Sequence, residues 1–305
     1  MNTPYVSSVR SSPYTCCKID PSLTLIAAGS SDGSLGVYDF DLKLRYALTG
    51  HHRGVTCLTF NPVSHHLVLS GSDDCHAILW DLRKKQAVFT ARGHNSYILD
   101  VDFHPHGSVF ATASNDETVC LWDVRSGNKL RTLEAHTDAV NTVNFSRDGT
   151  CLLTSSYEGH IRIWETSTGR CLQTLLNDGT GPCSFASFSP NEKYCLVGTT
   201  EEVSLWDLRG ELLRKLPEIG RSDYLTNSVF VDAPGTQFGN DVWCVIGVNE
   251  DDQLVLVDVD NNAVLETATL DFTPICLDMV DNSLVVCGFS EQGKGYLQCY
   301  ETLFE

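Results

Sequence analysis

The sequence has few basic residues and no long apolar run. Its 21 lysines and arginines face 39 aspartates and glutamates, which leaves a formal net charge of −18 at pH 7. Such a charge repels the phosphate backbone of nucleic acids and favours basic partners, such as arginine-rich or histone-like tails. No apolar stretch reaches the roughly 18 residues that a membrane-spanning helix needs, and the N-terminus has no apolar segment of signal-peptide length. We therefore expect no direct nucleic-acid binding, no membrane span and no secretion.

Sequence motifs of enzymes and metal sites are missing as well. The 13 cysteines include no CxxC pair, so zinc binding has no local pattern. The Gly-rich stretch 29–36 lacks the Gly-Lys-Ser/Thr of a phosphate-binding loop, and neither G-x-S-x-G nor H-E-x-x-H occurs. We interpret the cysteines as reduced, buried thiols. We expect no metal, no cofactor and no catalytic activity.

What the sequence does contain is a repeat. Seven dipeptides resemble Trp-Asp: Tyr38-Asp39, Trp80-Asp81, Trp122-Asp123, Trp164-Glu165, Trp206-Asp207, Val257-Asp258 and Tyr300-Glu301. The first five follow one another at intervals of 42 residues, and the last two intervals are 51 and 43. A period of about 40–45 residues with such an end is typical of a four-stranded propeller blade. The repeat predicts an all-β fold, a seven-bladed WD-repeat β-propeller that occupies residues 1–305 as a single domain.

The two ends of the chain predict how the ring closes. The last Trp-Asp-like pair ends what would be the third strand of blade seven. Residues 4–10 (PYVSSVR) have strand character and precede the first strand of blade one. We expect this segment to supply the missing fourth strand, because closure removes the exposed sheet edges. We interpret the insert at 219–241 in blade six as tolerated surface length rather than as a partner-contacting loop.

Three blades carry a second pattern, which predicts a buried hydrogen-bond network. A histidine precedes each Trp by 29 or 28 residues, a hydroxyl by ten and an acid by six. In WD-repeat blades these groups form one hydrogen-bond chain, since a buried Trp N–H needs an acceptor and a satisfied network fixes a unique packing. The residues are His51, Ser70, Asp74 and Trp80; His94, Thr112, Asp116 and Trp122; His136, Thr154, Glu158 and Trp164.

This interpretation also explains the acid–base pair in SSYEGHIRIWE (155–165). Glu158 becomes the turn acid of the third network, and His160 occupies an alternating strand position that faces solvent or a neighbouring blade. The pair is therefore not expected to be catalytic. Blades five to seven lack the pattern, and we expect apolar packing to hold them.

The repeat also locates the loops around the central channel, where propellers bind ligands. One set lies seven residues before each Trp-equivalent position: Ser31, Asp73, Asn115 and Tyr157. A second set opens the first strand of each blade: Thr56, Tyr97-Ile98-Leu99, Asn141 and Phe185. An acid with aromatic neighbours around an opening favours a cationic side chain, through charge pairing and cation–π contact.

Three segments carry a family resemblance: GHNSYILDVDFHPHG, EAHTDAVNTVNFSRDGTCLLTSSYEGHIRIWETSTGRCLQTL and CSFASFSPNEKYCLVGTTEEVSLWD. They resemble the WD-repeat core subunit of histone lysine methyltransferase complexes of the COMPASS/MLL type. The likeness is close over about 90–215, moderate over 20–90 and only architectural after 215.

The resemblance implies two binding sites. The first is a channel pocket for an arginine side chain, at Ser31, Thr56, Asp73, Leu99, Tyr157, Phe185 and Tyr224. Where the family stacks the guanidinium between two phenylalanines, this sequence has Leu99 and Asn227, which weakens the expected arginine readout. The second is a cleft on the opposite face for a segment of a companion WD-repeat subunit, at Asn191, Tyr194, Leu205 and Arg214.

The function expected from the sequence is therefore that of a non-catalytic nuclear scaffold. It would hold a SET-domain methyltransferase and a companion WD-repeat subunit, as one copy within a hetero-oligomeric complex that methylates histones. Two alternatives remain open. One is a WD-repeat scaffold of another machine, such as an RNA-processing, ubiquitin-ligase or centriolar complex, and the other is a histone-tail reader.

Overall fold

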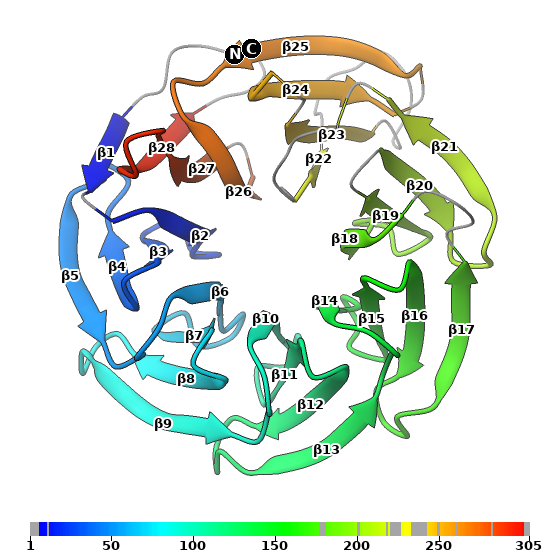
Figure 1. Cartoon of the computed structure of the whole chain (residues 1–305), viewed down its shortest axis with the longest axis horizontal. Helices are drawn as coiled ribbons and strands as arrows, with labels where there is room; N and C mark the ends of the chain where they lie inside the picture. Colours follow the sequence, from blue (N-terminus) through cyan, green and yellow to red (C-terminus); the bar gives the residue numbers. More distant parts are fainter. Residues whose placement is uncertain are drawn as a thin grey trace.

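The protein is built from strands alone in the part of the chain that the computed structural model describes. That part comprises residues 6–10, 12–176, 181–199, 202–217, 219, 227–232, 243–248, 251–259, 261–281 and 283–301. Within it, 28 strands form seven antiparallel sheets of four strands each. Figure 1 shows the sheets arranged radially around one central opening, so the predicted seven-bladed propeller is confirmed. None of the described residues belongs to a helix that could span a membrane.

Blades 1 to 4 follow the order of the chain. Blade 1 contains β2 (Tyr14–Ile19), β3 (Ile26–Ser30), β4 (Ser34–Tyr38) and β5 (Leu44–Thr49). Blade 2 contains β6 (Val55–Phe60), β7 (Leu67–Ser72), β8 (His76–Asp81) and β9 (Gln86–Arg92). Blade 3 contains β10 (Ile98–Phe103), β11 (Val109–Ser114), β12 (Thr118–Asp123) and β13 (Lys129–Glu134). Blade 4 contains β14 (Val140–Phe145), β15 (Cys151–Ser156), β16 (His160–Glu165) and β17 (Cys171–Leu176).

Blades 5 to 7 complete the ring. Blade 5 contains β18 (Cys183–Phe188), β19 (Tyr194–Thr199), β20 (Val203–Asp207) and β21 (Leu212–Leu216). Blade 6 contains β22 (Val229–Asp232), β23 (Trp243–Val248), β24 (Gln253–Asp258) and β25 (Ala263–Thr269). Blade 7 contains β26 (Thr273–Val280), β27 (Ser283–Phe289), β28 (Gly295–Glu301) and β1 (Val6–Arg10).

Blade 7 joins the two ends of the chain, as the sequence predicted. Its strand order is β1-β28-β27-β26, so the N-terminal strand is its outermost one (Figure 1). The pairing of β1 with β28 is antiparallel and runs from Val6 opposite Cys299 to Arg10 opposite Gly295. This pairing covers the outer edge of β28, which would otherwise be free to pair with another chain.

The turns between the second and third strands of blades 1 to 4 share one backbone conformation. Gly33, Cys75, Glu117 and Gly159 lie 42 residues apart and all have φ between 68° and 84°. Glycine adopts this left-handed region without steric cost, whereas a side chain there is strained. Blades 1 and 4 therefore have the preferred residue, and blades 2 and 3 accept strain to keep the same turn.

The apolar core lies between neighbouring blades rather than inside one sheet. Tyr14 and Cys17 of blade 1, for example, pack with Val285 and Leu297 of blade 7 in one buried cluster. Each sheet is thus covered on both faces by its neighbours. Blade 6 contributes Ile219 to such a cluster. Most of the 219–241 insert, including Tyr224, lies outside the described residues, so its interpretation as surface length stays a prediction.

Deletion of residues 1–10 should open the ring. Five paired residues of β1 are lost, and each ladder hydrogen bond contributes roughly 0.5–1.5 kcal/mol, so we expect a loss of several kcal/mol in unfolding free energy. The bared edge of β28 should also cause concentration-dependent aggregation. Thermal denaturation and light scattering measure both effects, and a synthetic peptide of residues 1–11 added in trans should reverse them. A truncated protein that melts and scatters like the full chain would contradict this closure.

Candidate functional site

A buried tryptophan anchors a chain of four polar groups in blade 2. Trp80 donates its indole N–H to Ser70 Oγ at 2.8 Å, and Ser70 Oγ lies 2.8 Å from His51 Nε2. His51 Nδ1 lies 3.0 Å from Asp74 Oδ2, which also accepts the backbone N–H of His52 at 2.9 Å. The loop before the blade is thereby joined to the turn between β7 and β8.

Blades 3 and 4 repeat this arrangement with threonine in place of serine. In blade 3, Trp122 donates to Thr112 at 2.9 Å, and His94 lies 2.7 Å from Thr112 and 3.0 Å from Asp116. In blade 4, the same order is Trp164, Thr154, His136 and Glu158, with distances of 2.9, 2.8 and 2.6 Å. The structure thus brings together all twelve network residues named from the sequence.

Glu158, the acid that suggested catalysis, is occupied by these contacts. It accepts hydrogen bonds from His136 and from the backbone and hydroxyl of Thr137, and it lies 3.4 Å from Arg162. Burial disfavours its charged form, but the hydrogen bonds from Thr137 and His136 outweigh burial and lower the pKa of Glu158 to about 2. His160 is half-buried and lies 3.3 Å from the same carboxylate. Glu158 is therefore a permanent acceptor rather than a group that exchanges protons near neutral pH.

The three network histidines differ in charge although their positions are equivalent. Burial lowers the pKa of His136 to about 4, so it is neutral at pH 7. Burial also opposes the charge of His94, but hydrogen bonds to Asp116 and Cys120 raise its pKa to about 9. Blade 3 therefore holds an ion pair where blade 4 holds a neutral imidazole. The folded-state pKa of His136 is depressed, so its network loses stability as pH falls, whereas that of His94 loses stability as pH rises through about 9.

In blades without this network, the polar atom of the side chain at the Trp position has a different hydrogen-bond partner. Trp206 of blade 5 donates to Ser204 at 2.9 Å, and the hydroxyl of Tyr300 of blade 7 donates to Gln298 at 2.8 Å, in both cases two residues back along the strand. In blade 1 the hydroxyls of Tyr38 and Tyr14 lie 2.7 Å apart. Blades 5 and 7 thus have no such network among the described residues, and a local hydrogen bond serves each ring beside the apolar packing. Blade 6 has Val257, which carries no polar side-chain atom.

The central channel is a cavity of about 510 Å³ lined by the innermost strands. In six blades the innermost strand has a β-bulge near its start, after the first residue in blades 1 to 5 and after the second in blade 7. A bulge redirects the side chain of the extra residue. The extra residues all line the cavity, namely Thr15, Thr56, Leu99, Asn141, Ser184 and Ile275.

Polar side chains on the innermost strands connect blade 3 to 4, blade 4 to 5, blade 6 to 7 and blade 7 to 1. Asp100 of blade 3 accepts the backbone N–H of Val143 in blade 4 at 2.9 Å. The equivalent bonds are Ala186 N–H to Thr142 at 3.1 Å and Leu277 N–H to Asn227 at 2.8 Å. Two residues further along, Phe145 N–H donates to Asp102 at 2.8 Å, Phe188 N–H to Asn144 at 3.4 Å and Ile19 N–H to Asp278 at 2.7 Å. Each bridge runs in the same direction around the ring.

Acidic groups outnumber basic ones along this lining. The charged residues of the cavity wall are Asp100, Asp102, Asp278 and Lys18. Lys18 and Asp278 form an ion pair at 2.7 Å. Burial raises the pKa of Asp100 to about 7 and that of Asp102 to about 6. The channel therefore gains negative charge as pH rises through the neutral range.

The channel residues expected from the sequence fall into two groups. Thr56, Leu99 and Asn141 line the cavity at the bulge. Phe185 also lines it, but it lies one register position further along its strand and packs against Gly198. Ser184 has the place expected for Phe185. Asn227 occupies the strand position that Asp100 has in blade 3, because its side-chain oxygen accepts the backbone N–H of Leu277 in blade 7.

The other expected channel residues lie in loops beside the innermost strands and are not among the residues that line the cavity. Ser31, Asp73, Asn115 and Tyr157 each donate a backbone N–H to the loop before the innermost strand of the same blade. Asp73 makes no side-chain hydrogen bond or ion pair within the described residues, and burial raises its pKa. Tyr97 in the loop of blade 3 and Tyr157 in the turn of blade 4 are 42% and 36% exposed, so the loops of neighbouring blades carry accessible aromatic surface.

The four residues of the expected companion cleft do not form one exposed surface. Asn191 uses its side-chain oxygen within the β18–β19 turn, where Ser189 and Lys193 donate to it at 2.9 and 3.0 Å. Leu205 is a buried core residue, and Tyr194 packs against the same cluster while remaining half-buried. Arg214 is exposed on β21, and its neighbours Leu212 and Leu213 are 42% and 43% exposed. Leu205 is 7% exposed and lies opposite Arg214 in the strand pairing, so the cleft at these four residues stays a prediction.

One group of potential ligands was missed in the sequence. Cys17, Cys276 and Cys287 place their sulfur atoms within 4.8 Å of one another. The cysteines were interpreted as scattered because Cys17 is about 260 residues away from the other two. Once strand pairing in blade 7 and closure of the ring are known, the register alone predicts their meeting.

Comparison with known families agrees with this geometry. The family described as WD domain, G-beta repeat matches residues 4–39, 42–81, 85–123 and 127–165, about half of the chain. These four segments end at the first four Trp-Asp-like dipeptides. The chain belongs to the WD40 repeat family, and it is a protein-interaction propeller.

Individual relatives match only part of this chain. Nuclear distribution protein PAC1 of Komagataella phaffii is 34% identical over 31% of the chain and 20% of its own length. A p21-activated protein kinase-interacting protein 1-like protein of Xenopus laevis is 31% identical over 30% of the chain and 25% of its own length. Apoptotic protease-activating factor 1 of Rattus norvegicus is 34% identical over 34% of the chain and 8% of its own length. By their names, none of these three is a histone methyltransferase subunit.

Substitution Thr154→Val should weaken blade 4 without changing the side-chain shape. It leaves the indole N–H of Trp164 without its acceptor and His136 without its hydroxyl partner, and each buried unsatisfied group costs about 1–3 kcal/mol. Urea denaturation should show the loss as a lower midpoint at constant slope. Thr49→Val, at an exposed position of β5, is the matched control and should have little effect. Equal midpoints for the two variants would contradict the prediction that the Thr154 hydroxyl stabilises the network.

Proposed function

We propose that this propeller is a non-catalytic scaffold subunit of a multiprotein complex and that its channel receives a cationic side chain of a protein partner. The observation that carries the proposal is the acidic lining of the channel, where three carboxylates face one lysine. A formal net charge of −18 adds long-range attraction for basic segments. The relatives named nuclear distribution protein and kinase-interacting protein support the general scaffold role.

The loops beside the innermost strands suit the first contact with such a partner. The carboxylate of Asp73 is unpaired within the described residues, and Tyr97 and Tyr157 present exposed aromatic surface. A guanidinium or ammonium group can pair with the acid and lie over a ring. Leu99 gives apolar contact but no cation–π interaction, so we propose weak selectivity for arginine over lysine.

Which multiprotein complex contains this protein is a separate and more specific proposal. A nuclear histone methyltransferase complex, with a SET-domain enzyme and a companion WD-repeat subunit, rests on the family resemblance alone. The buried Leu205 and the engaged Asn191 weaken the expected companion cleft. A scaffold of another multiprotein complex, the broader alternative, is therefore the better supported of the two. A free histone-tail reader remains the third, because the acidic channel favours basic peptides.

A peptide titration tests the channel. An unstructured peptide with one central arginine should bind more tightly than the same peptide with neutral citrulline. Asp73→Asn should weaken the arginine peptide by roughly tenfold, the equivalent of about 1.4 kcal/mol, and should not affect the citrulline peptide. Asp41→Asn, the same charge change on an exposed outer turn, is the control.

The pH dependence of this binding follows from the channel carboxylates. Asp100 and Asp102 have raised pKa values of about 7 and 6, so both lose most of their protons as pH rises from about 5 to about 8, roughly one unit beyond each value. A bound cation favours the charged carboxylates, and affinity should therefore increase over this range. Calorimetry at several pH values measures it. Equal affinity for arginine and citrulline peptides, or a flat pH profile, would contradict the cationic site.

Native affinity purification with mass spectrometry tests the complex. Recovery of a SET-domain methyltransferase and a second WD-repeat protein in stoichiometric amounts would support the histone methyltransferase proposal. Another stable assembly would support the broader scaffold role. A chain recovered alone from native extract would argue against both scaffold proposals.

A further inference from the structure

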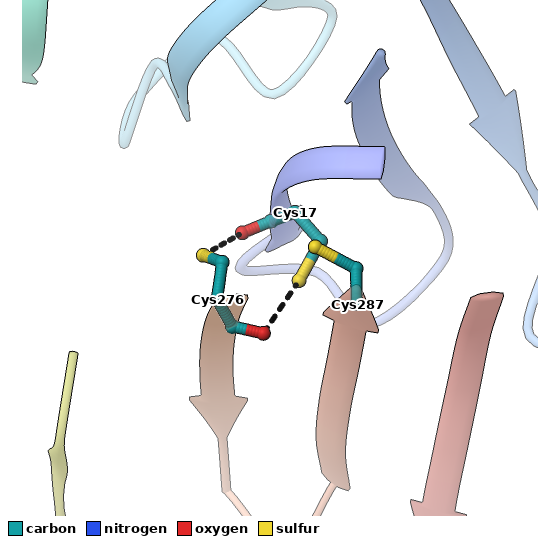
Figure 2. A group of neighbouring side chains, drawn as sticks. All are labelled: Cys17, Cys276 and Cys287. Atoms are coloured by element: carbon teal, nitrogen blue, oxygen red, sulfur yellow. Dashed lines mark hydrogen bonds between the residues drawn. The ribbon is translucent and has the colours of Figure 1, made fainter. Parts of the chain in front are cut away.

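Three thiols from two blades meet beside the central channel, at the junction where the ring closes. Cys17 comes from β2 of blade 1, and Cys276 and Cys287 come from β26 and β27 of blade 7. Figure 2 shows the three residues side by side, with the sulfur of Cys276 directed at the backbone oxygen of Cys17 and the sulfur of Cys17 at that of Cys276. Their sulfur atoms all lie within 4.8 Å of one another. The two blades are also tied by reciprocal contacts, since each of Cys17 and Cys276 donates its S–H to the backbone carbonyl of the other at 3.6 Å.

The register of the propeller makes this cluster a departure from the repeat. Cys276 itself has counterparts, because Cys16 and Cys57 hold the same register position in blades 1 and 2, where Asp100 stands in blade 3. Opposite this position the second strand has glycine in blades 1, 2 and 5, but it has Cys287 in blade 7. The departure is therefore Cys287, which adds a second sulfur where blades 1 and 2 have a glycine against the thiol.

The surroundings of the cluster suit a bound ion. Cys17 and Cys287 are completely buried, which shields two ligands from competing water. Cys276 is half-buried and lines the channel, so an ion has a path of entry. The carboxylates of Asp100 and Asp102 share the channel and attract cations toward it.

The spacing and chemistry of the ligands limit which ion fits. A metal–sulfur bond of about 2.3 Å places three ligands about 4 Å apart around one ion, so the thiols need to close by less than about 1 Å. A ligand set made only of sulfur selects soft ions such as Cu(I) and Zn(II) over hard ones such as Mg²⁺ or Ca²⁺. No His, Asp or Glu joins the group within the described residues, so three sulfurs would suffice for Cu(I), and Zn(II) would add water from the channel.

We propose that Cys17, Cys276 and Cys287 bind one thiophilic metal ion, Cu(I) or Zn(II), which clamps blade 7 to blade 1. Binding displaces the thiol protons, and the metal–sulfur bonds replace weak S–H contacts. The clamp does not depend on the function proposed for the channel.

Metal competition titration tests the proposal. The full chain, reduced with a phosphine and kept free of oxygen, is titrated with Cu(I) and separately with Zn²⁺ against a chromogenic chelator. We expect one tight equivalent for at least one of the two ions, and that ion should raise the melting temperature. Cys276→Ser should weaken this equivalent more than about 100-fold, since even loss of an outer-shell partner costs 10–100-fold, and should abolish the rise in melting temperature.

Cys151→Ser is the matched control, because Cys151 is also half-buried on a strand but belongs to blade 4. It should keep the tight equivalent and the thermal shift. Circular dichroism of each metal-free variant shows whether it folds, and X-ray absorption of the metal-loaded chain should show three sulfur ligands. Equal loss in the two serine variants, no tight equivalent for either ion, or a bound ion without effect on melting would overturn the clamp.

Discussion

The pairing of β1 with β28 is the constraint on which the rest of the ring depends. Every other sheet is made of four consecutive strands, and only blade 7 combines strands from both ends of the chain. Each blade buries its faces against its two neighbours, so an open ring would leave two faces and one strand edge in water. The N-terminal strand is outermost in its sheet, so the closure acts at the rim of the propeller, far from the channel (Figure 1).

Near the channel a different interaction takes over. The backbone groups on the channel side of the innermost strands have no further strand to pair with, and side chains of the preceding blade serve them instead. Asp100 and Asp102 each accept a backbone N–H of blade 4. The same carboxylates give the channel its acidic lining, so structure and binding share one set of groups. A channel ligand that draws on these carboxylates also acts on the contacts between blades 3 and 4, and the raised pKa values report the cost of burying the two acids.

The sequence predicts those features whose partners lie within one repeat. The hydrogen-bond network is an example, because Trp80, Ser70 and His51 are at fixed spacings in each copy and the pattern recurs every 42 residues. The closing strand was also predictable, because the repeat left blade 7 without a fourth strand and residues 4–10 had strand character but belonged to no blade. Phe185 shows where such reasoning stops. A bulge shifts the register of its strand by one residue, and a bulge is set by backbone hydrogen bonds that leave no clear mark in a single sequence.

Contacts between blades are the least predictable from the sequence, because they join residues that the repeat does not relate. Leu205 matched a family position in the sequence, yet packing against blade 6 buries it. Cys17 and Cys276 are 259 residues apart and became neighbours only through closure.

The junction between blades 7 and 1 also explains why the ion pair and the three cysteines lie there. The chain passes from blade 7 to blade 1 at the rim through β1, but β26 and β2 face each other near the channel with no covalent link close by. Side chains alone hold them together at that radius. Asp278 accepts the Ile19 N–H and pairs with Lys18, which supplies one polar contact. The three thiols lie in the same junction, beside the buried apolar side chains of Tyr14, Val285 and Leu297, and a bond between them would add a link at the inner radius.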